Sequence, residues 1–529
     1  MNPRKLTTAE EAVSRIRDGS IVSFNGIGLI GMADGFFPAV EQRFLKEGHP
    51  RNLTLFSACG LGSEKKEMLH LAHPGMFSCV MAGYMYPFAV FSPALKANKM
   101  EGYNIPQGII SRNYREAAAG RPGFFTKVGL HTFADPRYQG CALNEVSKRK
   151  LVEVRELDGE EYLYFHTIRP DVCILRGTTA DPNGNITMEK ECNIFDPLSH
   201  AMAVRNNGGL VMVQVERLND IPADPHRVRI PGNLVDAIWV QETQAQTNLP
   251  GYNPYYSGEL RAPQEMLDTM CQGNLSRERI PGKPLTVAER VVARRAALEL
   301  KDCYTVNLGI GTPMLAASEA VQMGIMTDLH HLSIETGVTG GVPVPDAFGA
   351  VINADAIYDM ASQFDLYEGG GLDATLVGAL EIDGHGNVNV IKKDGLLIGA
   401  GGFHHVTYGP RKIVVCSRFR AGSGFSVKDG KVSLKDGHGD KFVRDVECIA
   451  LNAAYYRSLG KEIIYVTERG VFTLDDDGLV LSEIAPGLHP LRHILDQLPF
   501  EAKIAPDLRE MPAVCFEGLG LTPGEGSGV

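Results

Sequence analysis

One carboxylate stands apart in the stretch HLSIETGVTGGVP, residues 331–343. A short apolar run ends in Glu335, and Gly337, Gly340 and Gly341 follow it. A glutamate can act as an acid, a base, a metal ligand or a nucleophile. A nucleophilic oxygen must be uncluttered, and glycines beside it leave room for a bulky electrophile. The glycines are therefore compatible with a nucleophilic role for Glu335, and the residues alone leave the other roles open.

Other roles for this glutamate need partners elsewhere in the chain. His330 and His331 alternate across the predicted strand, so at most one of them shares a face with Glu335 as a metal ligand. A glycoside hydrolase needs a second carboxylate, and Asp346 or Asp365 keeps that alternative open.

A second glycine-rich stretch, GLLIGAGGF at residues 395–403, is a candidate source of hydrogen-bond donors. Gly399, Gly401 and Gly402 would let the main chain turn its N–H groups toward a developing oxyanion. The competing interpretation is a tight turn after a buried strand, and the pattern alone does not separate the two.

The sequence contains an internal repeat, and this repeat indicates the fold in which these residues are placed. Four pairs of segments occur in the same order, which indicates two copies of one unit. They are LTTAEEAVSRIRDGSIVSFNGIG (from residue 6) with LTVAERVVARRAALELKDCYTVNLGIG (285), NLTLFSACG (52) with HLSIETG (331), DVCILRGTTADPNGNIT (171) with DATLVGALEIDGHGNVNV (373), and GGLVMVQVERL (208) with RKIVVCSRF (411). Thr7 with Glu10 and Thr286 with Glu289 match capping boxes that would each begin a helix.

Strand-like runs alternate with helical ones in both copies, which predicts an α/β protein. We expect two homologous open α/β domains with largely parallel sheets. The N-terminal domain spans residues 1–275, and a connection rich in Pro, Gly, Asn and Tyr covers about 221–284. The C-terminal domain, residues 285–520, carries Glu335, and the glycine-rich tail 521–529 is expected to be flexible.

The repeat also allows a comparison within the chain. Aligning SACG with IETG places Ala58 where the second copy has Glu335. If the fold required this glutamate, both copies should carry a similar residue. The alanine therefore favours a chemical role for Glu335.

The glycine turns after the first strand of each copy suggest a dinucleotide-binding alternative. Gly26, Gly28 and Gly31 match G-x-G-x-x-G, but the next strand ends in SAC and offers no acid for a ribose. The turn at Gly309 and Gly311 lacks the third glycine. We favour simple turn closure for the first copy, whereas the second could present N–H groups at a helix start to an anion.

Composition excludes several classes of protein. The 529 residues carry a net charge of −11, from 63 acidic and 52 basic residues, which argues against a nucleic-acid partner. The ten cysteines form no C-x-x-C pair, which favours a reducing, cytoplasmic location. No run of 18 apolar residues occurs and the N-terminus has no apolar signal region, so we expect no membrane partner.

At this point the motifs carry a family resemblance over nearly the whole chain. The sequence resembles the family I coenzyme A transferases, most of all the single-chain propionate/acetate CoA-transferase branch. The matching stretches are SIETG, GAGGF, YNIPQG, NLGIGTP, HPRNLTLF, HLAHPG, FTKVGLHTF and SQFDLYEGGGLD. Thr336 stands where relatives often have Ser or Asn, which are also small and polar.

The resemblance implies an enzyme that transfers coenzyme A between short-chain acyl-CoA thioesters and free carboxylates by a ping-pong mechanism. Glu335 would become a glutamyl-CoA thioester, and Gln107 with the N–H groups near Gly401 and Gly402 would stabilise the oxyanions. A thioester hydrolase on the same scaffold is the alternative. The implied contacts with coenzyme A are Gly309, Ile310, Gly311, Thr312, Pro313 and Gly399. Coenzyme A would be a substrate, no metal or permanently bound cofactor is implied, and a homodimer or homotetramer is expected.

Overall fold

The chain folds into two compact units, neither of which is continuous in sequence. The computed structural model describes residues 5–276, 278–280, 283–325, 331–344, 347–422, 424–428, 430–435 and 440–519. The first unit comprises Met1–Arg261, Ile334–Leu366 and Asp394–His405, and the second comprises Ala262–Ser333, Tyr367–Lys393 and Val406–Val529. Two segments of the C-terminal copy, one with Glu335 and one with the glycine-rich stretch, therefore belong to the first unit.

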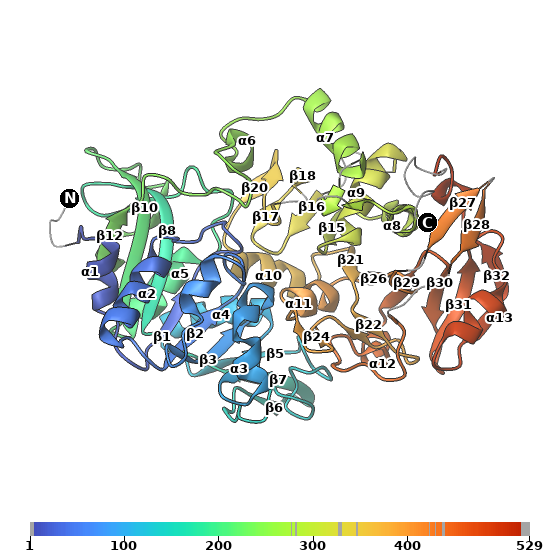
Figure 1. Ribbon diagram of the computed structural model, residues 1–529, viewed down its shortest axis with the longest axis horizontal. Helices are drawn as coiled ribbons and strands as arrows, with labels where there is room; N and C mark the ends of the chain where they lie inside the picture. The colour runs from blue at the N-terminus through green and yellow to red at the C-terminus, as the bar shows by residue number, and fades with distance from the viewer. Residues whose placement is uncertain are drawn as a thin grey trace. The chain divides into compact units, whose positions relative to one another are not determined.

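The first unit is built on one large sheet (Figure 1). Its strands are β1 (Ile21–Phe24), β2 (Leu53–Ser57), β3 (Phe77–Ala82), β4 (Glu101–Asn104), β8 (Val172–Ala180), β9 (Ile186–Thr187), β10 (Leu210–Leu218), β11 (Val228–Ile230) and β12 (Ala237–Val240). The path β12-β10-β8-β1-β2-β3-β4 is parallel throughout, and β9 and β11 extend it antiparallel. Strands such as β2 and β8 are buried at every residue, as expected for parallel strands covered on both faces.

Helices and smaller strands complete the first unit. Its helices are α1 (Ala9–Ser14), α2 (Phe36–Glu47), α3 (Ser92–Lys96), α4 (Gln107–Ala118), α5 (Pro197–Asn206) and α6 (Pro254–Ser257), and α10 (Met360–Glu368) begins in it. A separate antiparallel sheet contains β5 (Gly123–Thr126), β6 (Val152–Leu157) and β7 (Glu160–His166). The short strands β17 (Val338–Thr339) and β20 (Ala356–Ile357) pair antiparallel beyond Glu335.

The second unit repeats this plan. Its main strands are β15 (Thr305–Leu308), β16 (His331–Ile334), β21 (Ala374–Gly378), β26 (Lys412–Cys416), β29 (Glu462–Val466), β30 (Gly470–Leu474), β31 (Leu479–Ile484) and β32 (Lys503–Glu510). The path β16-β15-β21-β26-β29 is parallel, and β30 turns back antiparallel. Its helices include α7 (Gln264–Ser276), α8 (Val287–Ala297), α9 (Thr312–Gln322), α12 (Ala453–Ser458) and α13 (Pro490–His493). The prediction of an α/β fold with largely parallel sheets is confirmed.

The order of strands establishes the duplication. β2-β1-β8-β10 in the first unit corresponds to β16-β15-β21-β26 in the second, and the strands derive from the four repeated segments. The registers also agree, because Val22 lies opposite Leu55 and Val306 lies opposite Leu332. Counting three residues onward reaches Ala58 in one copy and Glu335 in the other, so these two positions are structurally equivalent.

An aspartate-centred turn recurs at the same place in both copies. Asp181 Oδ1 accepts bonds from the N–H groups of Asn183 and Asn185, at 2.8 and 2.9 Å. Asp383 Oδ1 accepts from the N–H groups of His385 and Asn387, at 3.0 and 2.9 Å. Such Asx turns form where a short side chain replaces a main-chain acceptor. Two copies of a whole hydrogen-bond pattern support duplication more strongly than sequence similarity alone.

Of the two predicted helix starts, one is right and one is wrong. Thr286 caps α8 in a capping box with Glu289, as predicted. In the first copy the cap of α1 is Thr8 with Glu11, so the predicted pair of Thr7 and Glu10 is wrong by one residue. Thr7 instead donates its hydroxyl hydrogen to Glu11 Oε2 at 2.6 Å. Adjacent threonines both fit the motif, and only the main-chain geometry selects between them.

The segment expected to connect the two copies also contributes strands to the first sheet. Within residues 221–284, β11 and β12 extend the first sheet, and the boundary between units falls at Arg261–Ala262. The domain limits drawn from the sequence treat each copy as contiguous and stay a prediction. The tail 521–529 lies outside the described residues. No helix in the described part of the chain is long and apolar enough to cross a membrane.

Candidate active site

Glu335 lies in a tight turn immediately after β16. Its neighbour Gly337 closes the turn by donating its N–H to the carbonyl of Ile334 at 3.1 Å. Gly337 has a φ of +96°, and a Cβ there would lie 2.2 Å from the carbonyl oxygen of Tyr358, so only glycine fits. Glu335 is half-buried, whereas Ile334 and Thr336 on either side are buried. The turn therefore leaves the Glu335 side chain partly exposed between two buried neighbours.

The glycine-rich stretch comes directly against this carboxylate. A Cβ atom added to Gly402 would lie 3.1 Å from Cγ and 3.3 Å from Cβ of Glu335. Contacts this short are tighter than an ordinary side-chain contact, so a larger residue would displace the carboxylate. The absence of a side chain at residue 402 therefore lets the main chain pass Glu335 without displacing its side chain.

Asn104, at the end of β4, holds the glycine-rich stretch. Its Oδ1 accepts the N–H of Ala400 at 2.9 Å, and its Nδ2 donates to the carbonyl of Ala82 at 2.8 Å. Gly399 has a φ of +81°, and a Cβ there would lie 2.5 Å from the carbonyl oxygen of Gly83. Gly399 is thus required for the close passage of two main chains.

Gln107 is the first residue of α4 and is buried. Its N–H donates to the carbonyl of Gly401 at 2.9 Å, which ties the start of α4 to the stretch beside Glu335. Its side-chain Nε2 donates to Met360 Sδ at 3.2 Å. Sulfur is a weak acceptor, so a stronger one such as an oxyanion would bind this amide better.

The two predicted main-chain donors differ. The N–H of Gly401 already donates to the carbonyl of Gly83 at 3.0 Å, and that of Phe403 donates to Ala400 at 3.0 Å. The N–H of Gly402 has no acceptor within the described residues. Of the predicted pair, Gly402 can therefore offer its N–H to a ligand, and Gly401 cannot without losing a bond.

Asp196 is a buried acid close to these residues. Its Oδ2 accepts from Ser111 Oγ at 2.5 Å, and its Oδ1 accepts from the N–H of Ala361 at 3.0 Å. Burial raises the pKa of Asp196 to about 7, and the charge of Asp359 adds to this effect, against the two hydrogen bonds and Arg115. No local sequence pattern points to this residue.

Comparisons with known proteins agree with this geometry. The family model described as "Coenzyme A transferase" matches residues 6–241. The chain is 39% identical over 525 residues to caffeate CoA-transferase from Acetobacterium woodii, with 97% of each chain covered. It is 37% identical to acetate CoA-transferase YdiF from Escherichia coli K12, with 97% of this chain and 95% of the relative covered.

The chain belongs to the coenzyme A transferase family. Solved structures agree: the acyl-CoA transferase YdiF apoenzyme from Escherichia coli O157:H7 superposes with a TM-score of 0.90 at 35% identity, over 99% of this chain and 98% of that one. The thioester complex of that enzyme with CoA superposes with a TM-score of 0.88 at 35% identity, over 98% and 97% of the two chains.

In this CoA transferase the first unit brings together Gln107, Gly399, Gly401, Gly402 and Glu335. The roles given to them remain predictions. Sequence reasoning missed Asn104, Asn193 and Asp196. Asn104 lies inside YNIPQG and could have been singled out there, whereas the remaining two showed no local signal.

The predicted coenzyme A turn lies in the second unit. Gly311 has a φ of +99° and precedes α9, which begins at Thr312. Gly309 donates its N–H to the carbonyl of Leu376 at 2.8 Å. Within the described residues the N–H groups of Ile310, Gly311 and Thr312 have no acceptor. Pro313 has no N–H and cannot donate a main-chain hydrogen bond to a ligand.

A dinucleotide site at the first glycine turn does not fit the structure of this CoA transferase, and neither does a glycosidase pair of Glu335 with Asp365. The turn at Gly26–Gly31 does not begin a helix, since α2 starts at Phe36, and a Cβ at Gly28 would lie 2.9 Å from Asn248 Oδ1. This glycine turn is therefore filled by the chain itself. Asp365 forms an exposed ion pair with Arg115 at 2.8 Å rather than a carboxylate partner for Glu335. His330 and Asp346 lie outside the described residues.

Cys59 does not compete with Glu335 as a nucleophile. It follows Ala58, the counterpart of Glu335, and it is fully buried. Burial, with the charges of Glu335 and Asp196, raises the pKa of the Cys59 thiol well above its usual range. Because the thiolate is the reactive form, this cysteine stays inert near neutral pH.

The close approach of Gly402 gives a first prediction. Gly402→Ala should lower kcat by about tenfold or more, because the new methyl group displaces the Glu335 carboxylate from its attacking position. Steady-state kinetics with acyl-CoA and acetate would measure this. Gly273→Ala, where a Cβ meets no atom within 4 Å, is the matched control and should leave kcat unchanged. Equal kcat values for both variants would refute the steric argument.

Asp196 gives a prediction about pH. In the unfolded chain its carboxyl titrates near pH 4, and in the folded chain near pH 7. Between these values the folded protein keeps a proton that the unfolded chain releases, so this group's stabilising contribution falls as pH rises and levels off above about 7. The melting temperature of the parent minus that of Asp196→Asn should therefore decrease from pH 5 to 7 and stay constant to pH 8.5. A difference that does not change with pH would show that Asp196 is ionised throughout.

Proposed function

We propose that this CoA transferase moves coenzyme A between short-chain acyl-CoA thioesters and free carboxylates through a covalent intermediate on Glu335. The observation that carries the proposal is the half-buried Glu335 side chain against Gly402, in the unit that also holds the Gln107 amide. The equivalent position in the other copy is Ala58, so the carboxylate is not a requirement of the fold.

The chemistry conserves the thioester. Glu335 attacks the thioester carbonyl, the C–S bond breaks, and an acyl–glutamyl anhydride and CoA thiolate result. The thiolate then attacks the glutamyl carbonyl and releases the first acid, which leaves Glu335 as a glutamyl-CoA thioester. An incoming carboxylate reverses both steps with the second acid. Each step develops negative charge on a carbonyl oxygen, which hydrogen-bond donors can stabilise.

The Gln107 amide and the N–H of Gly402 are the donors we assign to this oxyanion. Gly401 and Gly399 would act by shaping the turn, because the N–H of Gly401 is used within the protein. In the second unit, the N–H groups of Ile310, Gly311 and Thr312 at the start of α9 would bind an anionic part of coenzyme A. Binding energy from the remote nucleotide can be used at the reacting centre.

The names of the relatives support a proposal for the substrates, and the cysteines support a proposal for the cellular location. The relatives named for acetate and for caffeate support a carboxylic acid as the acceptor. Short-chain acids remain our proposal, and caffeate is the obvious competing acceptor to assay. All ten cysteines are free, which supports a reducing, cytoplasmic location. We also propose a homodimer or homotetramer, with no permanently bound cofactor or metal.

The covalent intermediate gives the decisive experiment. Protein incubated with acetyl-CoA should gain the mass of one glutamyl-CoA linkage, and Glu335→Gln should not, because an amide cannot form the anhydride. Glu153→Gln, at a half-buried glutamate of β6 paired with His166, is the matched control and should still form the adduct. An adduct that persists in Glu335→Gln would remove Glu335 from the mechanism.

Exchange measured in the same mixtures separates transferase from hydrolase. Labelled propionate should enter the acyl-CoA pool without net release of CoA, whereas a hydrolase would release free CoA.

Gln107 gives an independent prediction about rate. Gln107→Ala should lower kcat by about 10²–10³, because one oxyanion donor is lost. Met360→Leu keeps the bulk but removes the sulfur that holds the amide, and it should cost far less. Stopped-flow formation of the adduct would measure both rates. If Gln107→Ala forms the adduct at the parental rate, this side chain is not an oxyanion donor.

A further inference from the structure

A buried loop next to the candidate nucleophile carries unusually polar residues. It runs from Glu191 to Asp196, between β9 and α5. Glu191, Asn193 and Asp196 have exposed fractions of 6%, 0% and 1%. Burying polar and charged groups in a loop is costly unless each one is bonded, so their partners show what the loop does.

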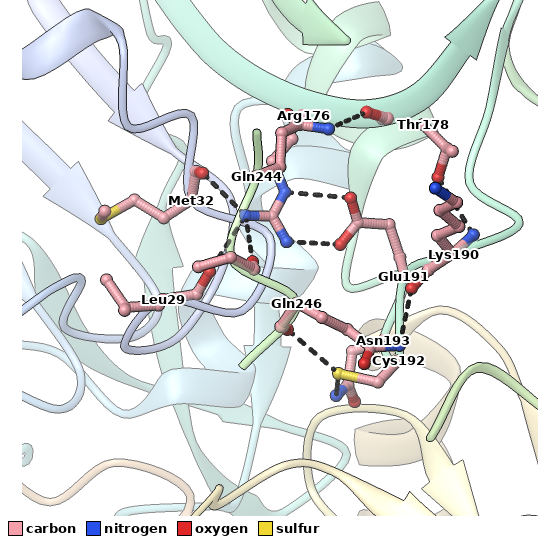
Figure 2. A network of polar contacts seen from close by, with 12 residues as sticks. Leu29, Met32, Arg176, Thr178, Lys190, Glu191, Cys192, Asn193, Gln244 and Gln246 are labelled. Carbon is pink, nitrogen blue, oxygen red and sulfur yellow. Dashed lines mark hydrogen bonds and ion pairs between the residues drawn. The ribbon is translucent and has the colours of Figure 1, made fainter. Parts of the chain in front are cut away.

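The start of the loop is fixed by an ion pair with Arg176 of β8 (Figure 2). The guanidinium donates Nε to Glu191 Oε1 at 2.9 Å and Nη2 to Oε2 at 2.6 Å. Nη1 donates to three carbonyl oxygens, those of Leu29, Met32 and Ala245, at 3.1, 3.0 and 2.9 Å. A bidentate pair with these extra bonds is geometrically demanding, so it gives Glu191 one fixed position.

Asn193, in the middle of the loop, contacts the segment that carries Glu335. Its Oδ1 accepts from the hydroxyl of Thr336 at 2.7 Å, and its Nδ2 donates to the carbonyl of Gly349 at 2.7 Å. Thr336 is the residue directly after Glu335 and is fully buried. The amide of Asn193 therefore holds the side chain of Thr336, the residue next to Glu335.

The end of the loop contacts the segment that meets Gln107. The carbonyl of Phe195 accepts the N–H of Met360 at 3.1 Å, and Asp196 accepts the N–H of Ala361. Met360 in turn accepts the Gln107 amide. Phe195 has a φ of +60°, a left-handed conformation that is strained for a bulky residue and that persists only where surrounding contacts impose it.

We propose that the loop Glu191–Asp196 positions both halves of the active site, with Asn193 as the positioning residue that orients Glu335 through Thr336. The proposal rests on the nucleophilic role proposed for Glu335. The loop touches no reacting atom. It fixes Glu335 through the hydrogen bond to Thr336, and it fixes Gln107 through the hydrogen bond to Met360. The ion pair of Glu191 with Arg176 attaches the loop to β8.

The hydroxyl of Thr336 provides the test, because it can be removed without changing shape. Thr336→Val should lower kcat and the rate of adduct formation on Glu335 by about tenfold. The KM for acyl-CoA should change less than about twofold, since the loss concerns orientation rather than binding. Thr336→Ser restores the hydroxyl and should recover the parental kcat. A parental kcat in Thr336→Val, or an equal loss in Thr336→Ser, would overturn the proposal.

A double-mutant cycle isolates the contact itself. Asn193→Leu should lower kcat at least as much as Thr336→Val, because it also removes the bond to Gly349. The double variant should lose no more than Asn193→Leu alone, because the bond that Thr336→Val removes is already absent there. Multiplied losses would show that the two residues act separately.

A control separates this effect from loss of stability. Thr467→Val removes a buried hydroxyl that donates to Gly470 at 2.7 Å in the second unit. It should lower the melting temperature without lowering kcat. If the parent forms no CoA adduct, the proposed function fails. If the parent forms it and Thr336→Val forms it at the same rate, only the positioning role fails.

Discussion

The main chain passes very close to the Glu335 side chain, and this lack of space determines which residues can surround the carboxylate. A Cβ on Gly402 would lie 3.1 Å from Cγ of Glu335, and a Cβ on Gly337 would lie 2.2 Å from the carbonyl oxygen of Tyr358. Because glycines cannot hold a shape by side-chain packing, the stiffness must come from hydrogen bonds. Asn104, Gln107 and Gly83 supply them from the N-terminal copy.

These hydrogen bonds accompany a division into compact units that are not continuous in sequence. The segments Ile334–Leu366 and Asp394–His405 come from the C-terminal copy, yet they pack with the N-terminal one. The N–H of Gln107 bonds to one of these segments, at the carbonyl of Gly401. Burying an acid such as Asp196 in the same region is tolerated because Ser111 and Ala361 bond both of its oxygens.

Much of the fold follows from pattern, and less of the site does. The four repeated segments predict two α/β copies with largely parallel sheets, and the apolar run before Glu335 predicts that this residue follows a strand, because strand periodicity and turn residues are local properties. The capping threonine was misplaced by one residue, since two adjacent candidates look alike. The partners of Asn193, the raised pKa of Asp196 and the difference between the Gly401 and Gly402 donors depend on contacts between distant segments. A single sequence holds no record of such contacts.

The N–H of Gln107 donates to the carbonyl of Gly401, and in the same way the N–H of Met360 donates to the carbonyl of Phe195. Both accepting residues have a left-handed main chain, with φ of +54° at Gly401 and +60° at Phe195. The duplicated copies therefore share a pair of such contacts as well as their strand order. At the position equivalent to Glu335 the first copy has Ala58, and the ring of Phe195 lies where a Cβ on Gly31 would come within 2.9 Å of it. A substitution at Phe195 would reach the segment of Met360 as well as the glycine turn of the first copy, so the copy without the carboxylate is not free to vary at this residue.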